Sequence, residues 1–165
     1  MDEAKKLLDR LLPALGLISI FCLALLIIRL LITDSFRFWF IPENLVLAWL
    51  ALLFGWLVVW GLSRWRWLSW QNVSLTIAWL LFLPNSWYVL TDFLHVYSSG
   101  EISQLYDIAM VFSLAAAGFL LGFASLYFVH MEFLKRWPAK ISHALVAAVL
   151  LLSSFGIHIG RDLRG

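Results

Sequence analysis

Five long apolar segments divide the sequence, and this division constrains the fold more than any other feature. A helix needs about 20 apolar residues to cross the hydrocarbon core of a bilayer. The apolar runs are continuous, whereas the strands of an outer-membrane barrel alternate polar and apolar residues. Because backbone groups in lipid must be hydrogen-bonded internally, we predict an all-α, polytopic transmembrane helical bundle that forms a single integral-membrane domain over residues 1–165. The five predicted spans run approximately Leu12–Thr33, Pro42–Leu62, Gln71–Leu90, Leu105–His130 and Ala139–Gly160.

The composition supports a membrane location and excludes several classes of protein. Hydrophobic residues make up 63% of the chain and charged residues 13%, whereas soluble domains are nearer half apolar and a quarter charged. The net charge of +2 is too small to indicate a nucleic-acid partner. Cys22 is the only cysteine, which excludes an intrachain disulfide and a cysteine-based metal site. No small-residue cleavage site follows the first apolar run, so we expect a retained helix rather than a cleaved signal peptide.

Lysine and arginine residues gather on one side of the predicted spans. The loops and tail on that side carry eight of them, against three on the other side, so the positive-inside rule places the N-terminus in the cytoplasm. Five spans then put the C-terminus outside the cell membrane. The stretch SRWRWLSW (63–70) interleaves arginine and tryptophan between two spans, where such residues typically anchor at lipid headgroups rather than bind nucleic acid. The eight are Lys5, Lys6, Arg10, Arg64, Arg66, Lys135, Arg136 and Lys140, and the three are Arg37, Arg161 and Arg164.

The predicted third span carries four polar side chains in its outer half. Pro84 removes one helical hydrogen bond, so we expect a kink there. If the helix continues, the four residues stand at i, i+3, i+7 and i+10 and fall within an arc of about 80°. Discontinuous helices build binding sites in transporters, which makes this face a candidate site for a polar ligand or an ion. Its residues are Asn85, Tyr88, Asp92 and His95.

The last two predicted spans add polar and small residues at the same outer end. Asp107 opens the fourth span, which also contains GFLLG (118–122), a small-xxx-small motif that lets two helices approach closely. The fifth span repeats this motif as GIHIG (156–160). The candidate ligand- or ion-binding residues are therefore Asn85, Tyr88, Asp92, His95, Asp107, His158 and Arg161, and the candidate helix-packing residues are Gly118, Gly122, Gly156 and Gly160.

Two interpretations of this outer cluster stay open. Charged groups at membrane depth are costly unless they are paired, so Asp92 and Asp107 would form a structural lock with Arg161 or Arg164. Alternatively, histidines and carboxylates that face each other suit proton transfer, a cation or a polar ligand. The two aspartates, with His95 and His158, are also metal-ligand types, but their spacing defines no site, and we predict no metal and no cofactor.

Three strings in the C-terminal half carry a family resemblance. FLPNSWYVLTDFLHV, YDIAMVFSLAAAGFLLGFASLYFVH and SSFGIHIGRDLRG resemble, in that order, the bacterial integral-membrane family catalogued as domain of unknown function 1361. The resemblance covers Leu80 to Gly165, and the first two spans match only as generic apolar helices. It implies a location in a bacterial cytoplasmic membrane and a helical architecture, and it supplies no activity. The family pattern marks Pro84, Asn85, Tyr88, Thr91, Asp92, His95, Tyr106, Asp107, Gly118, Gly122, Gly156, Gly160 and Arg161.

The chain departs from the family pattern at two places. Trp87 stands where a second proline is expected, which would soften the helix break. The chain ends at Gly165, whereas the pattern continues with a segment that bears tryptophan and aspartate and with further apolar sequence. A shortened form of the family would lack part of the site and a sixth span.

Three functions are compatible with these observations. The first is a small transport or ligand-binding unit, in which Asp92 and Asp107 titrate or bind a cation while Asn85 and Tyr88 orient a ligand. The second is a non-catalytic accessory or assembly protein that uses the two glycine motifs to contact a second copy or another membrane protein. The third is a membrane enzyme that acts on lipid or envelope substrates, although no HExxH, GxSxG or phosphate-cradling loop favours an enzyme. In each case the partner that surrounds the chain is the lipid bilayer, and we expect no nucleic acid.

Overall fold

The computed structural model describes residues 2–33, 36, 38–88 and 103–162, and these contain five α-helices and no strand. This architecture confirms the predicted all-α class. Four helices are longer than the spans expected from the sequence, most of all α1, which begins before Leu12, and α4, which continues past His130. The helices are α1 (Asp2–Thr33), α2 (Phe40–Leu62), α3 (Trp70–Tyr88), α4 (Gln104–Arg136) and α5 (Ala139–Asp162).

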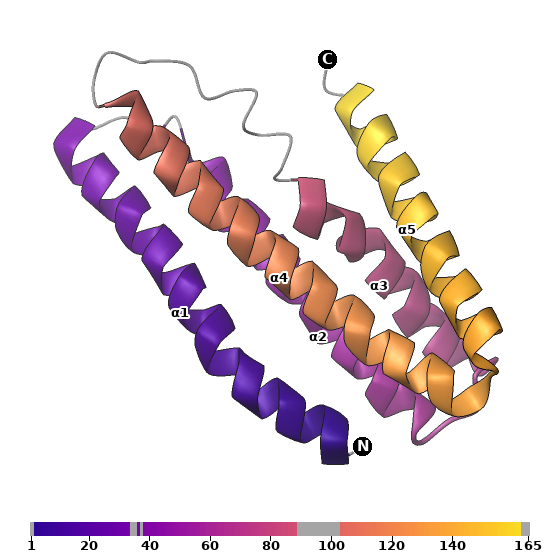
Figure 1. The fold of residues 1–165 in the computed structure, drawn as a ribbon. Coiled ribbons are helices and arrows are strands. Elements are labelled where there is room, and N and C mark those ends of the chain that lie inside the picture. The colour runs from indigo at the N-terminus through magenta and orange to yellow at the C-terminus, as the bar shows by residue number, and fades with distance from the viewer. Residues whose placement is uncertain (1, 34–35, 37, 89–102, 163–165) are drawn as a thin grey trace.

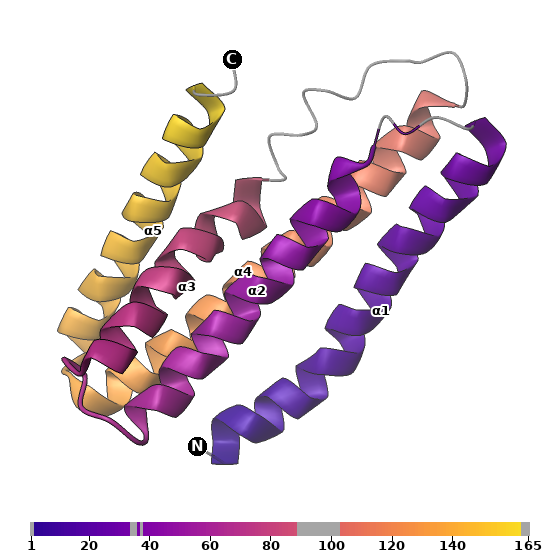
Figure 2. The same ribbon diagram turned by 180° about the vertical axis from the view of Figure 1, so that it is seen from behind.

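Successive helices run in opposite directions, and α2 and α4 form the centre of the bundle (Figures 1 and 2). α1 packs mainly on α4 along one side, and α5 packs on α3 along the opposite side. The start of α1 and the α2–α3 and α4–α5 connections share one end of the bundle (Figure 1). The ends of α1, α3 and α5 point towards the other end, where α2 and α4 begin.

A chain of buried hydrogen bonds joins the three inner helices. The indole Nε1 of Trp79 on α3 donates to the hydroxyl oxygen of Ser125 on α4 at 2.8 Å. That hydroxyl in turn donates to the carbonyl oxygen of Ala51 on α2 at 2.7 Å. A side chain at Gly55 would collide with the Ser125 hydroxyl, so this glycine allows α2 and α4 to approach closely.

Four of the helices in the described part of the chain, α1, α2, α4 and α5, are long and apolar enough to cross a membrane. The outer two bury only 22% (α1) and 11% (α5) of their apolar windows inside the bundle, against 50% for α2 and 56% for α4. Large side chains such as Leu31 (79% exposed) and Leu151 (72% exposed) are therefore uncovered by protein. A bilayer removes such surfaces from water, and these features are those of a multi-pass membrane protein.

α3 differs from the other four helices in composition. Gln71 and Asn72 occupy its first turn, and Pro84 and Asn85 lie in its last turns, so it contains no stretch as apolar as those of the other four helices. The helix continues through Pro84 and is described as far as Tyr88. The last two residues of the predicted third span lie outside the described residues, and the kink at Pro84 stays a prediction.

Candidate functional site

A small cavity of about 80 Å³ lies between α2, α3 and α5. Asn85 and Tyr88, the two described residues of the polar face predicted on the third span, line this cavity. Gly156 and Gly160 of the GIHIG motif line it as well. Its eight lining residues are Asn44 and Leu47 from α2, Pro84, Asn85 and Tyr88 from α3, and Gly156, Ile157 and Gly160 from α5.

The glycines of α5 leave room for this cavity. A Cβ atom at Gly156 would lie 3.4 Å from Cγ of Pro84, and one at Gly160 would lie 3.9 Å from Cε2 of Tyr88. These are ordinary or slightly tight contacts, so neither glycine is required for α5 to pack. Any larger side chain at Gly160 would extend towards Tyr88 and fill the space that α3 and α5 now enclose.

Asn85 and Tyr88 lie one helical turn apart, so both side chains belong to the same face of α3. The amide Nδ2 of Asn85 donates to the carbonyl oxygen of Leu81 at 3.3 Å. This bond uses only one of the amide's two N–H groups and leaves its side-chain oxygen as an acceptor. Asn44, which the sequence analysis did not single out, supplies a second amide from the first turns of α2. Its position at the outer start of a predicted span was the only sequence signal that could have identified it.

Asp107 belongs to a different structure, a buried ion pair between α4 and α1. Its Oδ1 accepts a hydrogen bond from Nε of Arg29 at 2.7 Å, and its Oδ2 lies 3.4 Å from Nη2 of the same arginine. Arg29 is 0% exposed and Asp107 is 1% exposed. The guanidinium also stacks 4.5 Å from the ring centroid of Phe38 and donates to the hydroxyl of Thr33 at 3.2 Å.

The partner of Asp107 therefore differs from the one expected from the sequence. We expected Arg161 or Arg164 to pair with Asp107, but Arg29 of the first helix occupies that position. α1 and α5 lie on opposite sides of the bundle, which puts the helix that carries Arg161 away from this pair (Figures 1 and 2). The neighbouring Tyr106 strengthens the same α1–α4 contact, because its hydroxyl donates to the carbonyl oxygen of Leu25 at 2.7 Å.

The remaining candidates divide into those that the structure describes and those that it does not. Asp92 and His95, Arg164 and the side chain of Arg161 lie outside the described residues. His158 is exposed on α5 between the two cavity glycines and does not line the cavity. Within residues 2–33, 38–88 and 103–162, no three His, Cys, Asp or Glu side chains come close enough to hold a metal ion.

The GFLLG motif packs inside the chain. Gly118 and Gly122 are both buried. A Cβ at Gly122 would lie 2.5 Å from Nε1 of Trp87 and 2.9 Å from Cβ of Ser86, so α3 rests directly on the backbone of α4 here. The Trp87 indole N–H and the Ser86 hydroxyl are buried without a hydrogen-bond partner in the described part of the chain. Trp87, which stands where a second proline was expected, therefore serves as a packing residue against Gly122.

Comparison with known proteins identifies the family and leaves the activity open. No curated protein and no solved structure matches the chain. The sequence model of a family described as "Protein of unknown function (DUF1361)" matches residues 43–165. The match begins further towards the N-terminus than the resemblance from Leu80 suggested, and it includes every residue that lines the cavity but not Arg29. Since the matched residues make up well over half of the sequence, the chain belongs to the DUF1361 family.

Proposed function

We propose that this protein is a five-span membrane protein that binds a small polar solute or ion in the cavity between α2, α3 and α5, as a transport or ligand-binding unit. In this proposal α3 also crosses the membrane, in addition to the four long apolar helices. Its 19 residues rise about 28 Å at 1.5 Å per residue, close to the hydrocarbon thickness of about 30 Å. Its polar first and last turns would then lie near the two headgroup regions, where water is available.

The orientation in this proposal follows from the charge distribution over the bundle. The basic residues of the N-terminal tail and of the α2–α3 and α4–α5 connections gather at one end (Figure 1). The positive-inside rule assigns this end to the cytoplasm, so the cavity lies in the outward half. Cysteine labelling checks this assignment, because Lys140→Cys should react with an impermeant reagent only after the membrane is opened. Labelling from outside would contradict it.

The observation that carries the proposal is the convergence of Asn44, Asn85 and Tyr88 on one cavity that glycines keep open. Two amides and a phenol supply both donors and acceptors to a ligand. The volume of about 80 Å³ corresponds to a few water molecules. A ligand of this size is a monovalent cation or a neutral solute of a few heavy atoms, and sugars and nucleotides are too large.

The charge balance also favours a weakly held ligand. The carboxylate of Asp107 pairs with the guanidinium of Arg29, so the proposal does not use it as a cation ligand. Among the described residues the cavity wall contains no charged side chain. Asp92 and His95 stay in the proposal as sequence-based candidates for a charged ligand group.

The test fills the cavity and measures binding. Thermal unfolding of the purified protein is followed in detergent with sodium, potassium or ammonium chloride, or with glycerol or urea, as probes. We expect at least one probe to alter the melting temperature of the wild type in a saturable way, and Gly160→Leu to abolish this response. Gly16→Leu is the matched control, because a side chain there meets no atom within 4 Å. A wild type that responds to none of the probes, or a response that survives in Gly160→Leu, would contradict the proposal.

A second candidate is a non-catalytic accessory or assembly protein, in which the buried Arg29–Asp107 pair would serve as a structural lock. A lock predicts that substitutions at the pair act only through folding. A cavity-based function predicts that Asn85→Leu and Tyr88→Phe fold normally and fail to restore the phenotype of a strain that lacks the gene. If both variants fold and fully restore that phenotype, the accessory function is the better assignment.

A further inference from the structure

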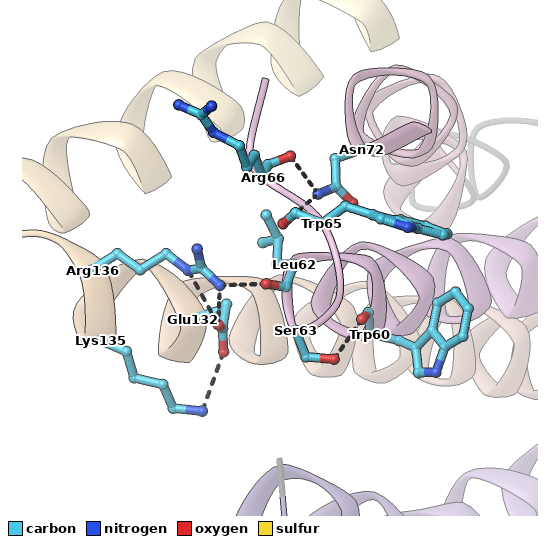
Figure 3. Close-up of polar contacts among 9 residues, drawn as sticks. All are labelled: Trp60, Leu62, Ser63, Trp65, Arg66, Asn72, Glu132, Lys135 and Arg136. Atoms are coloured by element: carbon cyan, nitrogen blue, oxygen red, sulfur yellow. Dashed lines mark hydrogen bonds and ion pairs between the residues drawn. The ribbon is translucent and has the colours of Figure 1, made fainter. Parts of the chain in front are cut away.

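The α2–α3 loop, defined here as residues 63–69, is anchored by hydrogen bonds from the buried side chain of Asn72 at the start of α3. The side chain of Asn72 is 1% exposed, and its Nδ2 lies 3.0 Å from the carbonyl oxygen of Arg66 and 3.4 Å from that of Trp65 (Figure 3). A side chain at Gly61 would collide with Asn72, so this glycine admits the buried amide. The loop is therefore organised before any ligand arrives.

A network of charged side chains holds the adjoining end of α2. Nη2 of Arg136 donates to the carbonyl oxygen of Leu62 at 2.7 Å (Figure 3). Glu132 pairs with Arg136 at 3.0 Å and with Lys135 at 3.2 Å. Lys135 and Arg136 at the end of α4 therefore already have an acidic partner, Glu132, within the protein.

The two arginines of the loop are in a different situation. Arg64 stacks over the ring of Trp60 with 4.4 Å between its Cζ and the ring centroid, which leaves its N–H edge available. The guanidinium of Arg66 points away from the Glu132 network in Figure 3 and has no hydrogen-bond or ion-pair partner within the part of the chain that the structure describes. A planar guanidinium matches the geometry of a phosphate group and binds it through two parallel hydrogen bonds.

The residues around these two arginines indicate which class of phosphate compound they would bind. Arg64, Trp65, Arg66, Trp67, Leu68 and Ser69 line an open concavity of about 710 Å³. Leu68 is 86% exposed and Trp70 is 75% exposed, and the loop joins two apolar helices. Exposed tryptophan and leucine beside arginine are suited to the boundary between headgroups and acyl chains, whereas a soluble phosphate compound needs no apolar neighbours.

We propose that the α2–α3 loop is a binding site for the phosphate group of an anionic phospholipid, with Arg66 and Arg64 as its ligands and Leu68 and Trp70 in contact with the acyl chains. This site lies at the opposite end of the bundle from the cavity. It needs the chain to sit in a membrane but does not depend on what the cavity binds.

The experiment measures lipid retention by native mass spectrometry of the full chain, purified in detergent and mixed with equal amounts of phosphatidylglycerol and phosphatidylcholine. We expect the wild type to retain phosphatidylglycerol preferentially, and Arg66→Gln to reduce this preference about fivefold, the factor associated with one arginine at an anionic surface. Arg10→Gln removes the same charge from an exposed position at the same end of the bundle and should leave the preference unchanged.

Two further variants distinguish a specific phosphate-binding site from nonspecific, diffuse electrostatic attraction of the protein to anionic lipid. Arg66→Lys keeps the charge and loses the planar fork, so the site predicts a partial loss and diffuse attraction predicts none. Asn72→Ala changes no charge and should also lower the preference, since it frees the loop; thermal unfolding checks that it folds. Equal losses in Arg66→Gln and Arg10→Gln, or no preference in the wild type, would overturn the proposal.

Competing ligands complete the test. Millimolar inorganic phosphate should leave the retained phosphatidylglycerol in place, because the acyl chains contribute to its binding. Complete displacement by phosphate would show a site for the free anion instead. Binding of a labelled single-stranded oligonucleotide that Arg66→Gln abolishes would assign the loop to nucleic acid and overturn the lipid site.

Discussion

Replacing Asp107 with asparagine should strongly destabilise the bundle, because it leaves the guanidinium of Arg29 charged and buried. Arg29 is 0% exposed, and the carboxylate of Asp107 accepts hydrogen bonds from both its Nε and its Nη2. Removing one partner of a buried ion pair costs about 3–5 kcal/mol. Asparagine retains one acceptor oxygen, so we expect about 3 kcal/mol for Asp107→Asn and a value nearer 5 kcal/mol for Asp107→Leu.

A double-mutant cycle isolates the interaction from the loss of either side chain. Arg29→Met leaves the carboxylate buried and should cost a similar amount. The double variant Arg29→Met, Asp107→Leu removes both charges and replaces them with apolar side chains, a change that is often neutral or stabilising. It should therefore recover most of the stability, so the two single costs together should exceed the cost of the double variant by about 5 kcal/mol or more. Unfolding by sodium dodecyl sulfate in mixed micelles, followed by tryptophan fluorescence, gives the free energies.

Matched controls define the result that refutes this reasoning. Glu43→Gln makes the same change of charge at an exposed position on α2 and should cost less than about 1 kcal/mol. A cost for Asp107→Asn no larger than that of Glu43→Gln would refute the claim that the pair is desolvated. If Arg161→Gln costs as much as Arg29→Met, Asp107 has a second partner and the assignment of the pair to α1 alone is wrong.

Two further predictions concern the packing of the inner helices. Gly122→Ala should cost about 1–3 kcal/mol in the same unfolding assay, because the added methyl group collides with Trp87. The control Gly156→Ala should change the free energy of unfolding by less than about 1 kcal/mol. Equal costs for the two variants would contradict the close α3–α4 contact. Ser125→Ala should cost about 1–2 kcal/mol, since it leaves the buried indole N–H of Trp79 without its acceptor, and a loss below roughly 0.3 kcal/mol would show that water replaces the hydroxyl.

The fold class could be predicted because a bilayer permits few structures. Apolar runs of span length in a bilayer allow little besides helices, so the inference of fold class does not need the lateral order of the helices. The common face of Asn85 and Tyr88 was also accessible, since it depends only on 3.6 residues per turn within one helix. The composition of α3 was harder to interpret, because its polar first and last turns leave it without a stretch as apolar as those of the other four helices.

The partner of Asp107 could not be predicted, because sequence periodicity does not tell which helices are neighbours in the bundle. Arg29 and Arg161 both lie near the outer ends of their predicted spans, so topology alone placed either of them at the level of Asp107. The choice depends on which helix stands beside α4 at that level, and this is decided by packing between residues 78 positions apart. The same limit applies to Asn44, which reaches the cavity only because α2 lies against α3.

The separation of the ion pair from the cavity makes the two proposed functions independently testable. The pair joins α1 to α4, and the cavity lies between α2, α3 and α5, so no residue contributes to both. Distant sites with no shared partner have additive effects on stability. The double variant Arg29→Met, Asp107→Leu should therefore keep the probe response of the wild type if it folds. Loss of that response in a folded double variant would mean that the charge of the pair acts on the cavity, and the lock would then be part of the binding function.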